Sequence, residues 1–182
     1  MMPFQRLLDL MISNDIAQLG DFVGVPSTEI QAMELHFNLQ FPTAYRAFLG
    51  ACGRSAGHLA GWSSIYFDDL KEIAEEFDFH WATFKSGQPC ADSPLPPQAL
   101  LIAHYDSHFD YLICDASDTA IYRLSFHDTC ISTYTFSDSF ETYMESMILA
   151  AADSSGQIAP FFIDECGNMI KDDLCIIAPE VE

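Results

Sequence analysis

The spacing of apolar residues changes near the middle of the chain. In the first half, apolar residues recur at intervals of three and four, which is typical of amphipathic helices. This spacing predicts four helices, over residues 3–19, 27–38, 42–48 and 68–77. A run of β-branched and aromatic residues at 62–67 predicts a short strand before the last of these helices.

The second half of the chain alternates apolar and polar residues, which is typical of strands with one buried face. Turn-prone polar residues separate four such runs, which predict strands at 100–104, 109–114, 120–124 and 130–136. Because the intervening turns are short, we expect an antiparallel meander. A helix is predicted over 137–152, with a continuous apolar stripe that can cover the sheet.

The C-terminal tail, residues 153–182, contains two further apolar runs. Phe161–Ile163 and Met169–Ile170 flank a polar turn and predict a small hairpin, and Leu174–Ile177 predicts a further strand. The elements together predict an α+β fold, in which N-terminal helices pack on a mostly antiparallel sheet of about four to six strands. A C-terminal helix closes this fold, and the hairpin-like tail follows it.

Local polar residues predict where the helices begin and end. Gly20 is expected to close the first helix. The run Ser27–Gln31 is expected to supply the N-cap of the second helix, with a capping box from Thr28 to Gln31. Asn38 suits the end of the second helix and Asp68 the beginning of the fourth. The proline-rich stretch 86–98 has no periodicity and predicts an exposed loop.

Length and composition fit one globular domain, so residues 1–182 are expected to form a single unit with its own core. Six cysteines are scattered without a CxxC pair, which indicates reduced thiols rather than a disulfide or zinc framework. The N-terminal segment has no unbroken apolar run, which argues against a signal peptide or a membrane span there. We therefore expect a cytoplasmic protein.

The net charge is −20, from 7 basic and 27 acidic residues. Because nucleic-acid-binding proteins neutralise phosphates with clustered Lys and Arg, this charge argues against direct nucleic-acid binding and favours a basic protein partner. The acidic residues that are candidates for partner contact lie on the predicted helix 68–77 and in the loop near 106. They are Asp68, Asp69, Glu72, Glu75, Glu76, Asp106 and Asp110. A solvated outer helix face remains the alternative interpretation of the helical residues.

The densest cluster of metal-ligand side chains is the segment 104–110. His104, Asp106, His108 and Asp110 alternate and would share one face of a straight strand, which would suit a metal site. Asp106 and the serine after it also predict a turn, and a solvated turn would need no metal. No GxSxG, GxGxxG or GxxxxGK[ST] motif occurs, and we expect no cofactor.

Several short motifs occur in an order that resembles the SUKH superfamily. They are Pro26–Ile30 with Glu34, the run LQFPTAYRAFL at 39–49, Cys52-Gly53, LLIA at 100–103, YLICD at 111–115, IYR at 121–123 and FSDSFETY at 136–143. The resemblance spans about residues 24–150. The cysteine at 52, the histidine at 104 and the unmatched tail 153–182 depart from the family pattern.

The SUKH superfamily contains bacterial toxin-immunity proteins and a fungal regulator of cell-wall synthesis. The resemblance implies a protein that binds rather than catalyses, with a cognate toxin domain as its partner. A nucleic-acid-targeting toxin would present a basic surface, which the acidic chain complements. Two alternatives remain open at this stage: a regulatory interaction scaffold, and a metal-dependent enzyme that uses the His104–Asp110 cluster. The oligomeric state is left open.

Overall fold

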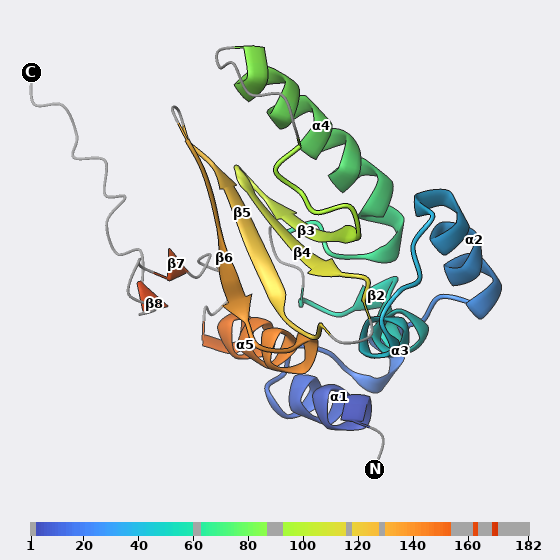
Figure 1. Cartoon of the computed structure of the whole chain (residues 1–182). Coiled ribbons are helices and arrows are strands. Elements are labelled where there is room, and N and C mark those ends of the chain that lie inside the picture. The colour runs from blue at the N-terminus through green and yellow to red at the C-terminus, as the bar shows by residue number, and fades with distance from the viewer. Residues whose placement is uncertain are drawn as a thin grey trace, which may run out of the picture.

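The structure is a computed structural model of the chain. It describes residues 3–59, 63–86, 93–115, 118–127, 130–153, 162–163 and 169–170 (Figure 1). The helices are α1 (Pro3–Ser13), α2 (Ser27–Phe37), α3 (Thr43–Cys52), α4 (Leu70–Ser86) and α5 (Phe140–Asp153), with single 3-10 turns η1 (Leu19–Asp21) and η2 (Phe67–Asp69). The strands are β1 (Phe22–Val23), β2 (Ser55–Ala56), β3 (Ala99–Tyr105), β4 (His108–Ile113), β5 (Ile121–Phe126), β6 (Ile131–Ser137), β7 (Phe162–Ile163) and β8 (Met169–Ile170).

The main sheet has the order β3-β4-β5-β6, and each neighbouring pair is antiparallel. This confirms the predicted α+β fold and its meander. Helix α4 packs along β3 on one face, while α1, α3 and α5 gather on the other side of the sheet (Figure 1). β1 pairs with β2, and β7 pairs with β8 in the expected tail hairpin. The sheet therefore separates two apolar layers.

The larger layer lies between the sheet and helices α1, α3 and α5. At its centre Phe48 is fully buried and its ring contacts those of Phe4, Tyr45 and Phe140, with centroid separations of 5.6 to 6.1 Å. The smaller layer packs α4 residues such as Phe77 against the opposite face of the sheet. Burial of large aromatic side chains dominates the energetics of such layers.

A shift of register in β3 decides which side chains face which layer. The ladder between β3 and β4 skips one residue between Leu101 and Ala103. Ile102 and Ala103 consequently both belong to the larger layer, and the next residue, His104, turns toward α4. A bulge of this kind changes the face on which all later residues of a strand lie.

Helix α1 ends earlier than the sequence pattern predicted. Asp15 adopts a left-handed conformation with φ 58°, and Ile16 N–H donates to the carbonyl of Met11 at 2.9 Å. This is the pattern of a Schellman C-cap, so the helix stops before Gly20. Asn38, with φ 53°, ends α2 in the same way, as expected.

Three other local predictions are corrected by the structure. The N-cap of α2 is Pro26, which precedes the predicted run Ser27–Gln31, and it has no side-chain cap. Residues 63–66 form an isolated bridge from Ser64 to His104 instead of a strand. Asp69, rather than Asp68, accepts the Tyr66 N–H at the turn that leads into α4, and α4 runs on to residue 86.

Some predictions fall on residues that the structure does not describe, namely the strand at 174–177, residues 87–92 of the loop 86–98, and the first residue of the strand predicted at 62–67. Within the described part of the chain, Cys52, Cys114 and Cys130 are free thiols. None of the described helices combines the length and the apolar character needed to cross a bilayer.

Gly24 and Gly50 lie against each other, and replacing each of them by alanine should change the stability of the fold in opposite directions. A Cβ on Gly24 would lie 2.0 Å from the carbonyl oxygen of Gly50, whereas a Cβ on Gly50 would meet nothing within 4 Å. We expect Gly24→Ala to destabilise the fold by about 1–3 kcal/mol through overpacking. Gly50→Ala, in helix α3, should stabilise it by about 0.5–1 kcal/mol. Urea unfolding of both variants tests this, and equal midpoints would contradict the close approach.

Candidate functional site

The acidic face of α4 consists of Asp68, Asp69, Glu72, Glu75 and Glu76. Helix α4 buries Ile73 and Phe77 in the smaller layer against the sheet, and Leu70, at its start, in the larger layer. Helical spacing of 3.6 residues per turn places the three glutamates on the opposite side, with Glu72 and Glu75 exposed and Glu76 half-buried. The structure thus brings the helical candidates together on one surface.

The two aspartates at the base of this face already have partners. Asp68 lies 3.4 Å from the Nε of Arg54, and the same guanidinium also pairs with Glu29 of α2. Asp69 accepts the N–H of Tyr66. No ion pair among the described residues engages Glu72, Glu75 or Glu76. These three carboxylates are therefore the part of the acidic face whose charge is available to a partner.

Asp106 lies outside α4, on the hairpin that joins β3 and β4. It is exposed and adopts φ 52°, a conformation that Asp tolerates better than most residues. Its carbonyl oxygen lies 2.6 Å from Nε2 of His104, which closes the turn. The structure confirms the turn that the sequence predicted at this position.

Asp110 differs from the exposed loop carboxylate that the sequence predicted. It lies in β4, is 4% exposed and accepts hydrogen bonds from Arg123 Nε at 2.6 Å and Arg123 Nη2 at 2.8 Å. The Tyr143 hydroxyl donates a third bond at 3.0 Å. The Arg123 guanidinium also lies 3.7 Å from the centre of the Phe136 ring. Asp110 therefore links β4, β5 and α5 inside the protein, so it is not part of a surface that a partner can contact.

The four alternating residues of the segment 104–110 do not share one face. Because the chain reverses at the hairpin and β3 carries a bulge, the His104 ring stacks on Phe109, with centroids 4.4 Å apart, on the α4 side. Asp110 faces α5 on the other side, and His108 contacts Ser125. Within the described residues, no three His, Cys, Asp or Glu side chains are placed to hold a metal. The predicted metal arrangement is not formed.

His108 makes the stability of the fold depend on pH. Its Nδ1 lies 2.7 Å from the Ser125 hydroxyl, and burial, followed by the Arg123 guanidinium, lowers the pKa of His108 below 6.5. The unfolded chain takes up this proton at higher pH than the folded protein does, so the stability that neutral His108 contributes is lost as pH falls below 6.5. The difference in unfolding free energy between the wild type and His108→Gln should therefore narrow as pH is lowered. Urea unfolding on both sides of pH 6.5 measures it, and a constant difference would contradict this assignment.

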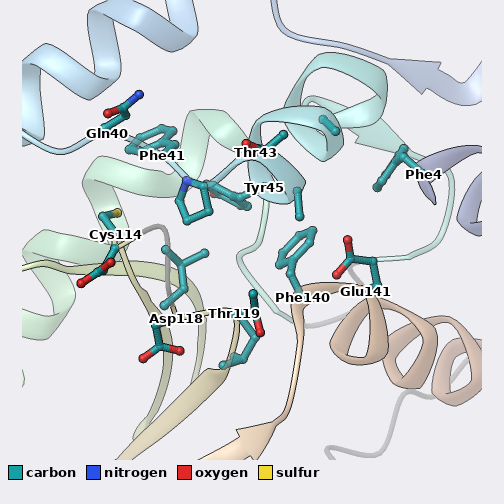
Figure 2. A pocket seen from close by; sticks show the side chains of 16 residues that line it. Phe4, Gln40, Phe41, Thr43, Tyr45, Cys114, Asp118, Thr119, Phe140 and Glu141 are labelled. Atoms are coloured by element: carbon teal, nitrogen blue, oxygen red, sulfur yellow. The ribbon is translucent and has the colours of Figure 1, made fainter. Parts of the chain in front are cut away.

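A cleft lies at the other end of the fold, between the start of α3, the end of β4, the loop before β5 and the start of α5 (Figure 2). Its volume is about 560 Å³. Figure 2 shows the rings of Phe41, Tyr45 and Phe140 around it, with the carboxylates of Asp118 and Glu141 coming from different elements.

The sequence analysis gave this cleft no role. Its walls come from α1, from residues between 40 and 47, from residues between 112 and 121 and from the start of α5, which are far apart in the chain, and their individual patterns predict only core and turn positions. The nearest signal was the aromatic spacing of Phe41, Tyr45 and Phe48, which predicted a helix. Burial raises the pKa of the Cys114 thiol in the cleft wall to about 12, so this thiol stays neutral.

Comparison with known proteins gives one family. The family model described as SMI1 / KNR4 family (SUKH-1) matches residues 24–146, which is more than half of the chain. The match includes α2, α3, α4, the four-stranded sheet and the first half of α5. No curated protein matches the chain.

Proposed function

The chain belongs to the SMI1/KNR4 family (SUKH-1), and we propose that it is an immunity-type protein that binds and neutralises a cognate toxin domain. SUKH proteins are commonly immunity proteins. In this proposal the whole chain acts as one cytoplasmic domain, blocks the toxin by occluding its active surface, and carries out no reaction of its own.

The single observation that carries the proposed partner chemistry is the acidic face of α4. Glu72, Glu75 and Glu76 point away from the core, and no ion pair within the described residues engages them. The surrounding chain carries a net charge of −20. Such a surface accelerates encounter with a basic protein and disfavours acidic ones, because complementary potentials steer diffusion. A toxin that acts on nucleic acid has the basic surface that this face complements.

Co-expression tests the proposed function directly. The chain is produced together with the C-terminal toxin domain encoded immediately upstream of it, and host survival and co-purification are scored. Rescue with a 1:1 complex is the expected result. The control is an inactive toxin variant, which should co-purify without any effect on survival.

Two results would overturn the immunity proposal. A toxic neighbour that kills the host despite abundant folded chain would show that the chain does not neutralise it. Recovery of several weak host partners, with no tight one, would favour a regulatory scaffold instead.

A further inference from the structure

The charged side chains among the described residues that line the cleft between α3, β4 and α5 are all acidic. Asp115, Asp118 and Glu141 line it, and no Lys, Arg or His is among its described lining residues. The two residues between Asp115 and Asp118 are Ala and Ser, which add no charge. Asp118 accepts bonds from the Ala120 N–H and the Tyr122 hydroxyl, so it is held in place. Carboxylates around a hollow with low-dielectric walls attract cations strongly.

The floor of the cleft is apolar. Phe41, Tyr45, Leu112, Ile121 and Phe140 contribute to it, and all of them are buried. A volume of about 560 Å³ lies inside the range of about 300–1,000 Å³ typical of pockets that bind ligands. An apolar floor with an acidic border suits a ligand that combines an apolar body with a positive charge.

Tyr45 adds an independent observation at the same wall. Its hydroxyl is buried and, alone among the buried side-chain polar atoms of the described residues, has no hydrogen-bond partner. Burial also raises the pKa of Tyr45, so the hydroxyl stays protonated. Buried polar groups of native proteins are rarely left unsatisfied, so this hydroxyl calls for a partner, such as a water or a ligand atom, that the described residues do not supply.

We propose that this cleft binds a short segment of the toxin partner in which a large apolar side chain is adjacent to Lys or Arg. The apolar side chain contacts the floor, and the cation lies against Asp115 and Glu141. This inference rests on the proposed function for the origin of the segment. It adds a second contact surface, separate from the acidic face of α4, that recognises sequence rather than charge alone.

Charge disfavours the two occupants that the chain itself could supply. Residues 154–182 contain six acidic residues and one lysine, Lys171, which follows Ile170 but is followed at once by Asp172 and Asp173, so the border of the cleft repels this tail. A second copy of the chain brings a further net charge of −20. A cationic segment of another protein is the occupant that the border attracts.

Three tetrapeptides with blocked ends probe the cleft on the full-length protein: Lys-Leu-Phe-Lys, Glu-Leu-Phe-Glu and Lys-Ser-Ser-Lys. Binding is followed by NMR shifts of Leu112 and Ile121 and by calorimetry. We expect the first peptide to bind at least about tenfold more tightly than the other two, because only it supplies both the apolar body and the charge.

Matched variants locate the binding. Asp115→Asn with Glu141→Gln removes two charges from the border and should weaken the first peptide about tenfold, a change of about 1.4 kcal/mol. Asp9→Asn with Asp21→Asn removes two exposed charges that lie outside both the cleft and the acidic face of α4, and should leave peptide affinity unchanged. Ala47→Phe, at an exposed position of α3 that lines the cleft, fills it and should abolish binding.

Tyr45→Phe tests the unpartnered hydroxyl separately. The variant should unfold at the same or higher urea concentration than the wild type, because it removes a buried polar atom without a partner. Tyr45→Phe should nevertheless bind Lys-Leu-Phe-Lys more weakly than the wild type does. A merely structural hydroxyl would change stability and leave peptide affinity unaltered.

The inference is overturned if the three peptides bind equally, or if the Asp115/Glu141 variant binds the first peptide like the wild type. It is also overturned if Ala47→Phe changes the sedimentation of the protein, which would indicate a second copy in the cleft. NMR shifts in residues 154–182 on peptide addition would indicate displacement of the tail and would overturn it as well. Because peptide binding is measured without the toxin, failure of the cleft proposal can be distinguished from failure of the immunity proposal, which co-purification with the toxin tests.

Discussion

Arg123→Met is expected to destabilise the protein by about 3–5 kcal/mol, the largest stability effect that we predict for a single polar side chain. Arg123 donates two hydrogen bonds to Asp110, whose side chain lies 5% exposed between the sheet and α5. Removing the guanidinium leaves a buried carboxylate without its counter-charge. Urea unfolding followed by circular dichroism measures the loss.

Two matched variants show whether burial is the reason. Arg6→Met breaks the pair between Arg6 and Glu145, in which the Arg6 side chain is 72% exposed, and should cost at most about 1 kcal/mol. Tyr143→Phe removes one donor to Asp110 and should cost about 1.5–3 kcal/mol. Equal losses for Arg123→Met and Arg6→Met would show that the buried network does not stabilise the fold.

Reversing the charges of Glu72, Glu75 and Glu76 to lysine is expected to slow association with the toxin partner by about 10- to 1,000-fold at low salt. The reason is that these side chains supply the steering potential of the acidic face, while their removal leaves the core side of α4 intact. Stopped-flow or surface plasmon resonance measurements give the association rate. The difference from wild type should shrink in high salt, because screening shortens the range of the potential.

A control variant separates local from overall charge. Asp9, Asp21 and Asp138 are exposed and lie outside α4, so reversing these three gives the same net charge with the acidic face unchanged. This control should associate much faster than the α4 variant. Identical rates for the two variants would show that only total charge matters and would remove the acidic face from the binding surface.

Much of the fold could be predicted from the sequence because its signals are local. Helical periodicity predicted the helix at 68–77, in which Leu70, Ile73 and Phe77 are buried, and the period of two with short intervening turns predicted the four antiparallel strands. Ordered short motifs predicted the family, which the match over 24–146 confirms. The acidic glutamates of α4 were also predicted on one helix face, because helical spacing alone fixes that arrangement.

The pairing of distant segments was decided only by the tertiary structure. The bulge in β3 sends His104 toward α4, and the register with β5 places Arg123 beside Asp110. His104 and Asp110, which belong to the cluster that suggested a metal site, therefore lie in two separate environments. The cleft likewise exists only where α3, β4 and α5 meet. Strand periodicity is local, whereas a one-residue change of register exchanges the two faces of a strand and depends on which partners fill the core.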